Sequence, residues 1–462
     1  MKLIKSDKKL IIIIFSIIAF ISIYMMPIPD LPIEGRKCLA IIIFAVIWLA
    51  GNVTAPAYTS LVILTSYVIL MDPNVVSIQE IMYGWTTPVI YMVIAGFLLA
   101  EAVTETGLGK RIALFFLTNF VNSYKSMIIL CYVLNIILCI IIPHPWPRCI
   151  LLASILVSVL TDFLPKEHLR QITLAIFAGG VSTSLIFLTG DPSFSSVVCA
   201  LSKTNVSFFD WFYYMFFPGM FVTIITCVSQ LLLFRLPNIS INKETILKKI
   251  TLKPITRKEK RLIFWLAIAL ILWSAGSVIN VDAGWSSALI VAILSLPVVG
   301  DVIDATTLKR ISIDTVIFLV AILSIGSVSK ASGMSDWLAR LLLSFGAPSN
   351  PWLFAFVATL ICMALHMIIG SSLSAMGVIT PPLISLGTTL GFPEIFPALI
   401  SFLALAGHWV LPYQHLTIQI GQNQTEESYT TGEVLLLSIP QTIAILLASQ
   451  ILTTWFAFIG MI

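Results

Sequence analysis

Residues 137–151, ILCIIIPHPWPRCIL, decide the fold. An apolar run stops at three prolines, Pro143, Pro145 and Pro147, and then resumes. Each proline removes a backbone donor and interrupts a regular helix. Irregular backbone is not tolerated in contact with lipid, so this segment cannot cross a membrane as one helix. It predicts a re-entrant hairpin whose tip, around His144 and Trp146, is buried in protein or faces an aqueous cavity.

Composition supports a membrane setting for this hairpin. The chain has 462 residues, of which 58% are hydrophobic and 10% charged, and its mean hydropathy is +1.03, whereas soluble domains carry about 25% charged residues. Its seven cysteines are scattered through apolar segments without a CxxC pair, so neither disulfides nor a zinc site is expected. The net charge of +4 reflects the loops and does not indicate nucleic-acid binding. We therefore expect a polytopic helical protein embedded in a lipid bilayer.

Positive charge predicts the orientation and the domain limits. Residues 235–261 hold nine Lys or Arg residues and form the only long polar stretch, which is typical of a cytoplasmic linker. Lysines at positions 2, 5, 8 and 9 place the N-terminus on the same side. The predicted divisions are an N-terminal span (1–34), a first repeat (35–234), the basic linker (235–261) and a second repeat (262–462).

An internal repeat supports the two halves. Residues 103–113, VTETGLGKRIA, resemble residues 329–339, SKASGMSDWLA, at a spacing of about 226 residues. The same spacing carries His144 to Gly370 and Ser371, and carries Asp191 close to Gln414 and His415. An odd number of spans in each half turns the second copy upside down, and inverted repeats with broken helices are typical of secondary transporters. The predicted fold is all-α, with about 11 transmembrane helices in two inverted repeats, each with a re-entrant hairpin and a broken helix.

Four interruptions define the predicted site. They are the first hairpin tip (residues 143–148), the second hairpin tip (370–374), the first loop (189–193) and the second loop (412–415). Helix N-termini at such interruptions present free amides to an anion, and carbonyls at the opposite ends can hold a cation. The substrate-binding candidates are Arg148, His144, Trp146, Ser371, Ser372 and His415, and the candidates for holding a coupling ion are Gly190, Asp191, Ser374 and Gln414.

Several candidates have a plainer alternative, and for Asp191 it is that Asp-Pro merely starts a turn. Arg148 has a guanidinium suited to carboxylate or sulfate, yet it could instead reach the cytoplasmic face or pair with Asp191. His144 and His415 could bind substrate or carry a coupling proton, or be neutral hydrogen-bonding groups at packed interruptions. His366 and His408 are interpreted as satisfied helix histidines. The serines of the second tip could simply pack, and Trp146 could be an interfacial anchor.

At these residues the chain resembles the divalent anion/sodium symporters, within the wider superfamily of elevator-type ion transporters. The similar segments are TTPVIYMVIAGFLLAEAVTETGLGKRIAL (86–114), GDPSF (190–194), GSSLSAMGVITPP (370–382) and LPYQ (411–414). The resemblance implies a scaffold domain for dimerisation and a transport domain that carries both hairpins, hence a homodimer. It also implies Ser-Asn-Thr at each tip, binding sodium and a substrate carboxylate, where this chain has His144-Pro145-Trp146 and Ser371-Ser372-Leu373.

The predicted function is secondary active transport of a small anion, a carboxylate or similar solute, coupled to sodium or protons. No P-loop, GxSxG or HExxH motif is present, so no enzyme activity and no cofactor other than a possible sodium ion are expected. The alternative is a channel-like or non-transporting membrane protein that retains the carrier scaffold, and a lipid-processing enzyme is the weakest hypothesis. We expect a multi-pass protein of the cell (inner or plasma) membrane with a cytoplasmic N-terminus.

Overall fold

The computed structural model describes residues 2–51, 53–162, 164–234, 237, 254–279, 281–424 and 428–462. Within these ranges the chain forms helices joined by loops and contains no strand. The predicted basic linker lies mostly outside the described residues, which resume at residue 254. The all-helical class predicted from the sequence is confirmed.

The helices fall into two successive series after α1 (Lys2–Met25). The first series contains α2 (Ile33–Ala50), α3 (Pro56–Leu70), α4 (Ile78–Ile81), α5 (Tyr83–Thr86), α6 (Pro88–Thr106), α7 (Leu108–Phe120), α8 (Tyr124–Ile141), α9 (Pro145–Leu160), α10 (Lys166–Ser184), α11 (Pro192–Leu201) and α12 (Phe208–Leu233). The second contains α14 (Arg257–Ile279), α15 (Ala283–Ser295), the 3-10 turn η1 (Thr307–Arg310), α16 (Ile313–Ala331), α17 (Met334–Ser344), α18 (Pro351–Ile369), α19 (Ser372–Thr389), α20 (Ile395–Ala406), the 3-10 turn η2 (Pro412–Gln414), α21 (Leu416–Gln424) and α22 (Thr431–Phe458). The order from α6 to α12 is repeated from α16 to α22.

Local sequence explains why matching helices end at matching places. Gly107 ends α6 with φ 80°, and Gly333 lies between α16 and α17 with φ 76°. This left-handed conformation favours glycine because it has no Cβ. The last helix of each series begins with a capping box, Ser207 with Asp210 and Thr430 with Glu433. The repeat found in the sequence is therefore also a repeat of helix boundaries.

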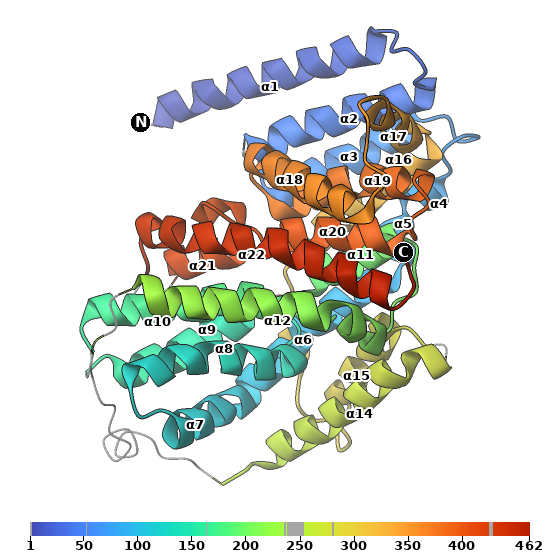
Figure 1. Cartoon of the computed structure of the whole chain (residues 1–462). Coiled ribbons are helices and arrows are strands. Elements are labelled where there is room, and N and C mark those ends of the chain that lie inside the picture. The colour runs from blue at the N-terminus through green and yellow to red at the C-terminus, as the bar shows by residue number, and fades with distance from the viewer. Residues whose placement is uncertain are drawn as a thin grey trace.

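The second copy is inverted relative to the first. Trp455, near the end of α22, donates an indole hydrogen bond to the carbonyl of Tyr213, near the start of α12, at 2.8 Å. Thr226 and Gln441 are hydrogen-bonded in the middle of the same pair. The two equivalent helices therefore run antiparallel side by side (Figure 1). The domain limits proposed from the sequence stay a prediction.

Each series also supports the other at the helix before its hairpin. The amide of Ala57, at the start of α3, donates to Asp314 Oδ1 on α16 at 3.2 Å. On the other side, α15 packs so closely on α6 that a Cβ at Gly284 would lie 2.1 Å from the carbonyl oxygen of Pro88. This reciprocal packing holds the two hairpins in one frame.

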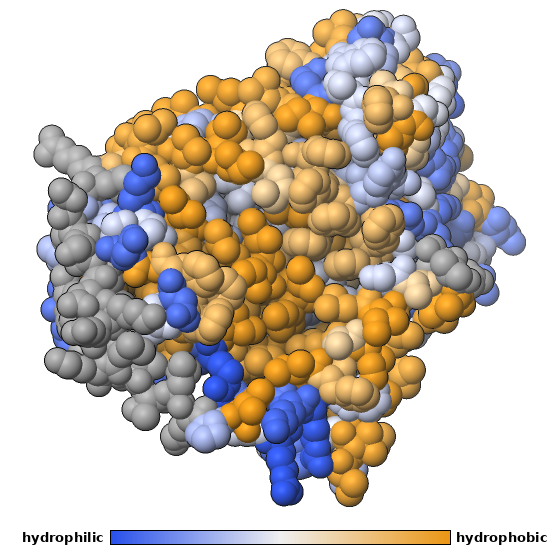
Figure 2. All heavy atoms as spheres, turned by 60° about the horizontal axis from the view of Figure 1, so that its bottom comes forward, coloured by the Kyte–Doolittle hydropathy of each residue, from blue (hydrophilic) through white to orange (hydrophobic). Residues whose placement is uncertain are grey.

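The surface of the protein suits a bilayer. Within the described residues, 6 helices are long and apolar enough to cross a membrane: α6, α8, α12, α16, α18 and α22. Figure 2 shows a broad apolar face, with hydrophilic residues gathered toward its edges. Large apolar side chains on this kind of surface, such as Leu232 and Phe458, are 78% and 79% exposed. Lipid rather than water is the solvent that fits such exposure.

Candidate substrate site

The first hairpin tip is an interruption between two helices, as the sequence predicted. Helix α8 ends at Ile141 and α9 begins at Pro145, and the amide of His144 donates to the carbonyl of Ile142 at 2.8 Å. Pro145 and Pro147 fall within the first turn of α9, where backbone N–H groups have no partner inside the helix. The prolines therefore cost α9 no hydrogen bond.

The second hairpin tip is built from glycine and serine. Helix α18 ends at Ile369, and Gly370 turns the chain with φ 72°. Ser371 then caps α19, accepting a hydrogen bond from the amide of Ser374 at 3.4 Å. The amides of Ser372 and Leu373, which begin α19, are left without partners inside the helix.

The two loops complete the arrangement. Asp191 caps α11, and its carboxylate accepts a hydrogen bond from the amide of Ser193 at 3.2 Å. In the second loop, His415 precedes α21, and its Nδ1 accepts from the amide of Thr417 at 3.3 Å. Four helices, α9, α11, α19 and α21, thus begin at the four interruptions.

These interruptions share one cavity of about 430 Å³. Trp146 from the first tip, Asp191 from the first loop, Ser372 from the second tip and His415 from the second loop all line it. Of the ten predicted site residues, seven lie on this wall: Trp146, Asp191, Ser371, Ser372, Ser374, Gln414 and His415. Three lie outside the lining: His144, Arg148 and Gly190. Residues of both hairpin tips therefore line the same cavity.

Arg148 is fully buried, and its guanidinium points into protein. A guanidinium has five N–H donors, and each bond described for it goes to an uncharged oxygen. Among the described residues no ion pair joins Arg148 to Asp191 or to another carboxylate. The acceptors are Asn135 Oδ1 (3.1 Å), the carbonyls of Ile142 (3.2 Å), Gly190 (3.4 Å) and Gly180 (3.1 Å), and Ser184 Oγ (2.8 Å).

His144 is also fully buried, behind Trp146. Its ring stacks on Phe97 with centroids 4.8 Å apart and meets Trp146 edge-on at 4.5 Å. Its Nε2 lies 3.3 Å from Ser193 Oγ, and its Nδ1 has no hydrogen-bond partner among the described residues. His144 therefore joins the first tip to the first loop from behind the cavity wall.

A histidine interpreted as an ordinary helix residue lies at the second tip. His366 Nε2 is 3.2 Å from the carbonyl of Gln414 and 3.0 Å from Ser372 Oγ. Ser372 Oγ donates to the same carbonyl at 2.8 Å. His408 Nδ1 approaches His366 Nδ1 at 3.4 Å. In the tautomer with a proton on Nε2, His366 donates to this carbonyl and links the helix before the second tip to the second loop.

The helix before the second hairpin provides part of the opposite wall. Asp314 and Thr315, at the start of α16, line the cavity together with Pro56 of α3. None of these three residues was predicted from the sequence. Ser312 at the N-cap and Asp314 in the first turn mark a helix start, but nothing local indicates that this start faces a tip.

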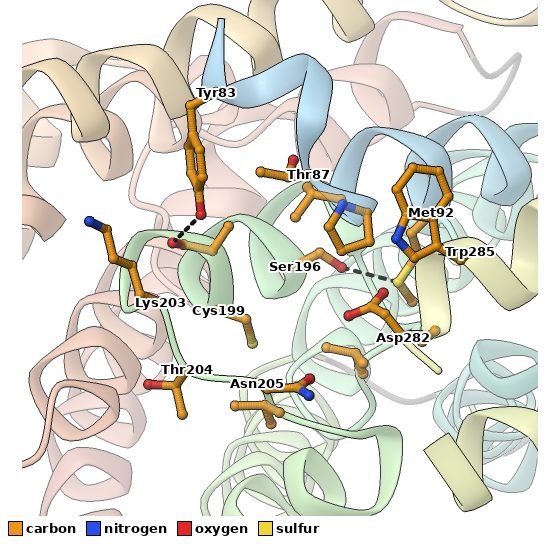
Figure 3. Close-up of a pocket in the computed structure, with 16 residues that line it drawn as sticks. Tyr83, Thr87, Met92, Ser196, Cys199, Lys203, Thr204, Asn205, Asp282 and Trp285 are labelled. Atoms are coloured by element: carbon orange, nitrogen blue, oxygen red, sulfur yellow. Dashed lines mark hydrogen bonds between the residues drawn. The ribbon is translucent and has the colours of Figure 1, made fainter. Parts of the chain in front are cut away.

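A larger cavity of about 620 Å³ lies elsewhere, between α6, α11 and α15. Figure 3 shows Lys203, Asp282 and Trp285 around it, with Tyr83 donating to the carbonyl of Ala200 and Ser196 to the sulfur of Met92. The C-terminal end of α11 and the carboxylate of Asp282 face this cavity, and both oppose an anion, although two helices, α6 and α15, also begin beside it. The cavity between the tips is the better anion site because four helix N-termini meet there.

The chain is similar to known transporters over nearly its whole length. Residues 7–462 match the family described as sodium:sulfate symporter transmembrane region. The putative malate transporter YflS of Bacillus subtilis (strain 168) is 20% identical over 373 residues, which cover 76% of each protein. Dicarboxylate transporter 1, chloroplastic, of Arabidopsis thaliana is 23% identical over 467 residues, covering 96% of this chain and 82% of that protein.

The fold is also found among solved structures. The crystal structure of the Alcanivorax borkumensis YdaH transporter aligns with a TM-score of 0.56 and 11% identity, covering 88% of this chain and 99% of that one. With the match over residues 7–462, the resemblance noted in the sequence is confirmed. The chain belongs to the sodium:sulfate symporter transmembrane family and is a multi-pass membrane transporter rather than an enzyme.

Proposed function

We propose that this protein is a secondary active transporter of small carboxylates or similar small anions. The observation that carries the proposal is the meeting of four helix N-termini at one cavity of about 430 Å³. Each helix N-terminus is equivalent to roughly half a positive charge, and its free amides are ready donors for carboxylate oxygens. The relatives named as malate and dicarboxylate transporters support the substrate class.

The substrate would lie between the second tip and Trp146. The free amides of Ser372 and Leu373 would hold one anionic group, and the side chain of Ser371 would add a donor. Arg148 would contribute its charge from behind the wall without touching the substrate. Movement of both tips together against α3 and α16 would carry the cavity across the bilayer.

Coupling, location and assembly belong to the same proposal. The family description supports sodium as a coupling ion, and protons are the alternative because histidines stand at both tips. We place the protein in the cell membrane with its N-terminus in the cytoplasm, on the distribution of Lys and Arg. A homodimer is proposed on the resemblance alone.

The test is uptake by the purified full-length protein in proteoliposomes. Malate, succinate and sulfate would be offered in turn, with sodium and proton gradients imposed separately. We expect at least one anion to accumulate above its external concentration. Equilibration without accumulation under every gradient would favour the channel-like alternative, and no uptake of any anion would refute the proposal.

A serine pair supplies a matched control for the location of the site. Ser372→Ala removes a side chain that bonds the second loop and should raise the half-saturating concentration by about 2- to 10-fold, since one such bond contributes roughly 0.5–1.5 kcal/mol. Ser344→Ala is the control, because Ser344 is exposed and its side chain donates to the carbonyl of Leu341 within α17 at 2.7 Å. Equal kinetics for the two variants would remove the second tip from the site.

A further inference from the structure

The oxygens around Arg148 form a cation-binding cage, which we define by its five acceptors: Asn135 Oδ1, the carbonyls of Ile142, Gly180 and Gly190, and Ser184 Oγ. Three are backbone carbonyls, one is an amide oxygen and one is a hydroxyl, and all lie 2.8–3.4 Å from guanidinium nitrogens. Neutral oxygens of this kind are ligands for hard cations. In broken-helix transporters, unwound carbonyls and helix C-terminal ends bind the coupling ion.

The cage is made by the parts of the first repeat that such an ion would need. Ile142 lies just past the end of α8, Gly180 and Ser184 lie in the last turns of α10, and Gly190 belongs to the first loop. Helix C-terminal ends favour a cation. Gly190 is required for this closeness, because a Cβ there would lie 2.2 Å from the carbonyl oxygen of Ser184.

We propose that the guanidinium of Arg148 takes the place of a coupling sodium ion at the first tip, so that this chain binds no sodium there. The inference rests on the proposed transport function and concerns what drives it. The family description names sodium, yet the residues of this cage do not fit a second cation. The cage already surrounds a full positive charge that is completely buried.

The second repeat is closed to sodium in a parallel way. The carbonyl of Ala406, at the end of α20, lies 3.0 Å from His415 Nε2, and the carbonyl of Gly407 accepts from Gln441 Nε2 at 2.9 Å. The carbonyl of Gln414 accepts from Ser372 Oγ and His366 Nε2. Protein donors therefore occupy the carbonyls of both repeats where a coupling ion would bind.

A tethered cation has a consequence for energetics. A bound sodium ion leaves on the far side of the membrane and is replaced, so its gradient does work in each cycle. The guanidinium of Arg148 stays with the chain in both directions. It stabilises the anion but draws no energy from a sodium gradient.

Thermal unfolding of the wild-type full-length protein tests this without relying on transport. The Tm would be measured in sodium chloride and in choline chloride at equal ionic strength. We expect no sodium-specific rise in Tm, since a ligand stabilises only a state that binds it. Uptake of any transported anion should agree within about 2-fold between the two salts, whereas loss of a coupling ion costs much more. A saturable sodium-specific rise in Tm would overturn the inference.

Arg148→Ala tests the cage itself. The emptied cage should lower the Tm in choline chloride, and millimolar guanidinium or sodium should restore part of the loss. Arg111→Ala is the control, because the side chain of Arg111 is 27% exposed and bonds to the carboxylate of Glu259 at 2.7 Å. Its removal therefore leaves no enclosed set of neutral oxygens that a cation could fill. If neither guanidinium nor sodium raises the Tm of the R148A protein, the inference is overturned. If R148A does not accumulate, the wild-type comparison decides alone.

The outcomes separate the two proposals. If the Tm of the wild-type protein does not depend on sodium and no anion is taken up, the transport function is refuted. The replacement of sodium by the guanidinium of Arg148 is then still supported. Sodium-driven uptake together with a sodium-dependent Tm would support the transport function and would refute the proposal that Arg148 replaces sodium.

Discussion

Replacing Asn135 by leucine tests whether the buried guanidinium is held as the structure shows. Asn135 is completely buried, and its Oδ1 accepts from Arg148 Nε at 3.1 Å. Its Nδ2 donates to the carbonyls of Cys131 at 2.9 Å and Ile176 at 3.0 Å. Leucine has the same branching and a similar volume, so the substitution removes these hydrogen bonds with little change in packing.

The expected cost follows from those bonds. A hydrogen bond to a charged group contributes about 1.5–3 kcal/mol and a neutral one about 0.5–1.5 kcal/mol, so the total loss is on the order of 3 kcal/mol. In a chain of this size that loss lowers the Tm by on the order of 5 °C. Arg148 Nε would be left buried without an acceptor, which is the main part of the penalty.

The assay is thermal unfolding of the purified variant in one detergent, beside the wild type. Asn74→Leu is the control, because Asn74 is exposed in the loop after α3 and its side-chain nitrogen donates to the nearby Asp72 Oδ1 at 2.9 Å. That substitution should change stability by less than about 0.5 kcal/mol. An N135L protein as stable as the wild type would refute the description of the guanidinium and its acceptors.

Three further predictions concern two glycines and the ion pair between Arg111 of α7 and Glu259 of α14. Gly370→Ala places a Cβ on a residue with φ 72°, which costs about 1–2 kcal/mol of stability, and it should weaken anion uptake. The control Gly346→Ala, at φ 85°, should cost similar stability and leave uptake unchanged. Equal uptake by both variants would argue against a role for the second tip. Gly190→Ala should abolish recovery of folded protein by size-exclusion chromatography, because the new Cβ would lie 2.2 Å from the carbonyl oxygen of Ser184. The control Gly432→Ala should be recovered normally, because the nearest neighbour given for its Cβ among the described residues is Thr430 Oγ1 at 3.9 Å. Glu259 lies outside the apolar part of α14, and the hydrogen bonds from Arg111 hold the pKa of its carboxylate below the ordinary 4.5. The stabilisation from these bonds is therefore present at neutral pH and is lost as the pH falls through the lowered pKa. Arg111→Ala should lower the Tm at neutral pH and flatten the dependence of the Tm on acid pH, and an unchanged Tm–pH curve would contradict this.

The interruptions in the helices could be predicted from the sequence because their causes are local. Proline at 143, 145 and 147 and glycine at 370 stop helices through backbone geometry alone. Because these helix-breaking residues recur at a spacing of about 226 residues, the two tips could be predicted to be equivalent. The residues on the cavity wall followed from this pairing, with Trp146 and Ser372 as the clearest cases.

The roles behind the wall could not be predicted because they depend on packing between distant helices. Arg148 was interpreted as a substrate contact, since nothing near it in sequence shows that Gly180 and Gly190 supply carbonyls to it. Asn135 offered one signal, a polar side chain within the apolar run of α8, which at membrane depth is expensive without partners. His366 lies 6 residues before Ser372, and the turn at Gly370 that brings the two together has no signature that fixes its direction.

The proposed function depends on an anion site that lies between the two hairpin tips. An experimental density map of the full-length protein with its transported anion bound tests this most directly. We expect density for the anion between Trp146 and the first residues of α19, within hydrogen-bonding distance of the amides of Ser372 and Leu373. Density for the anion in the cavity beside Lys203 and Asp282, with the space between the tips filled by side chains, would contradict it.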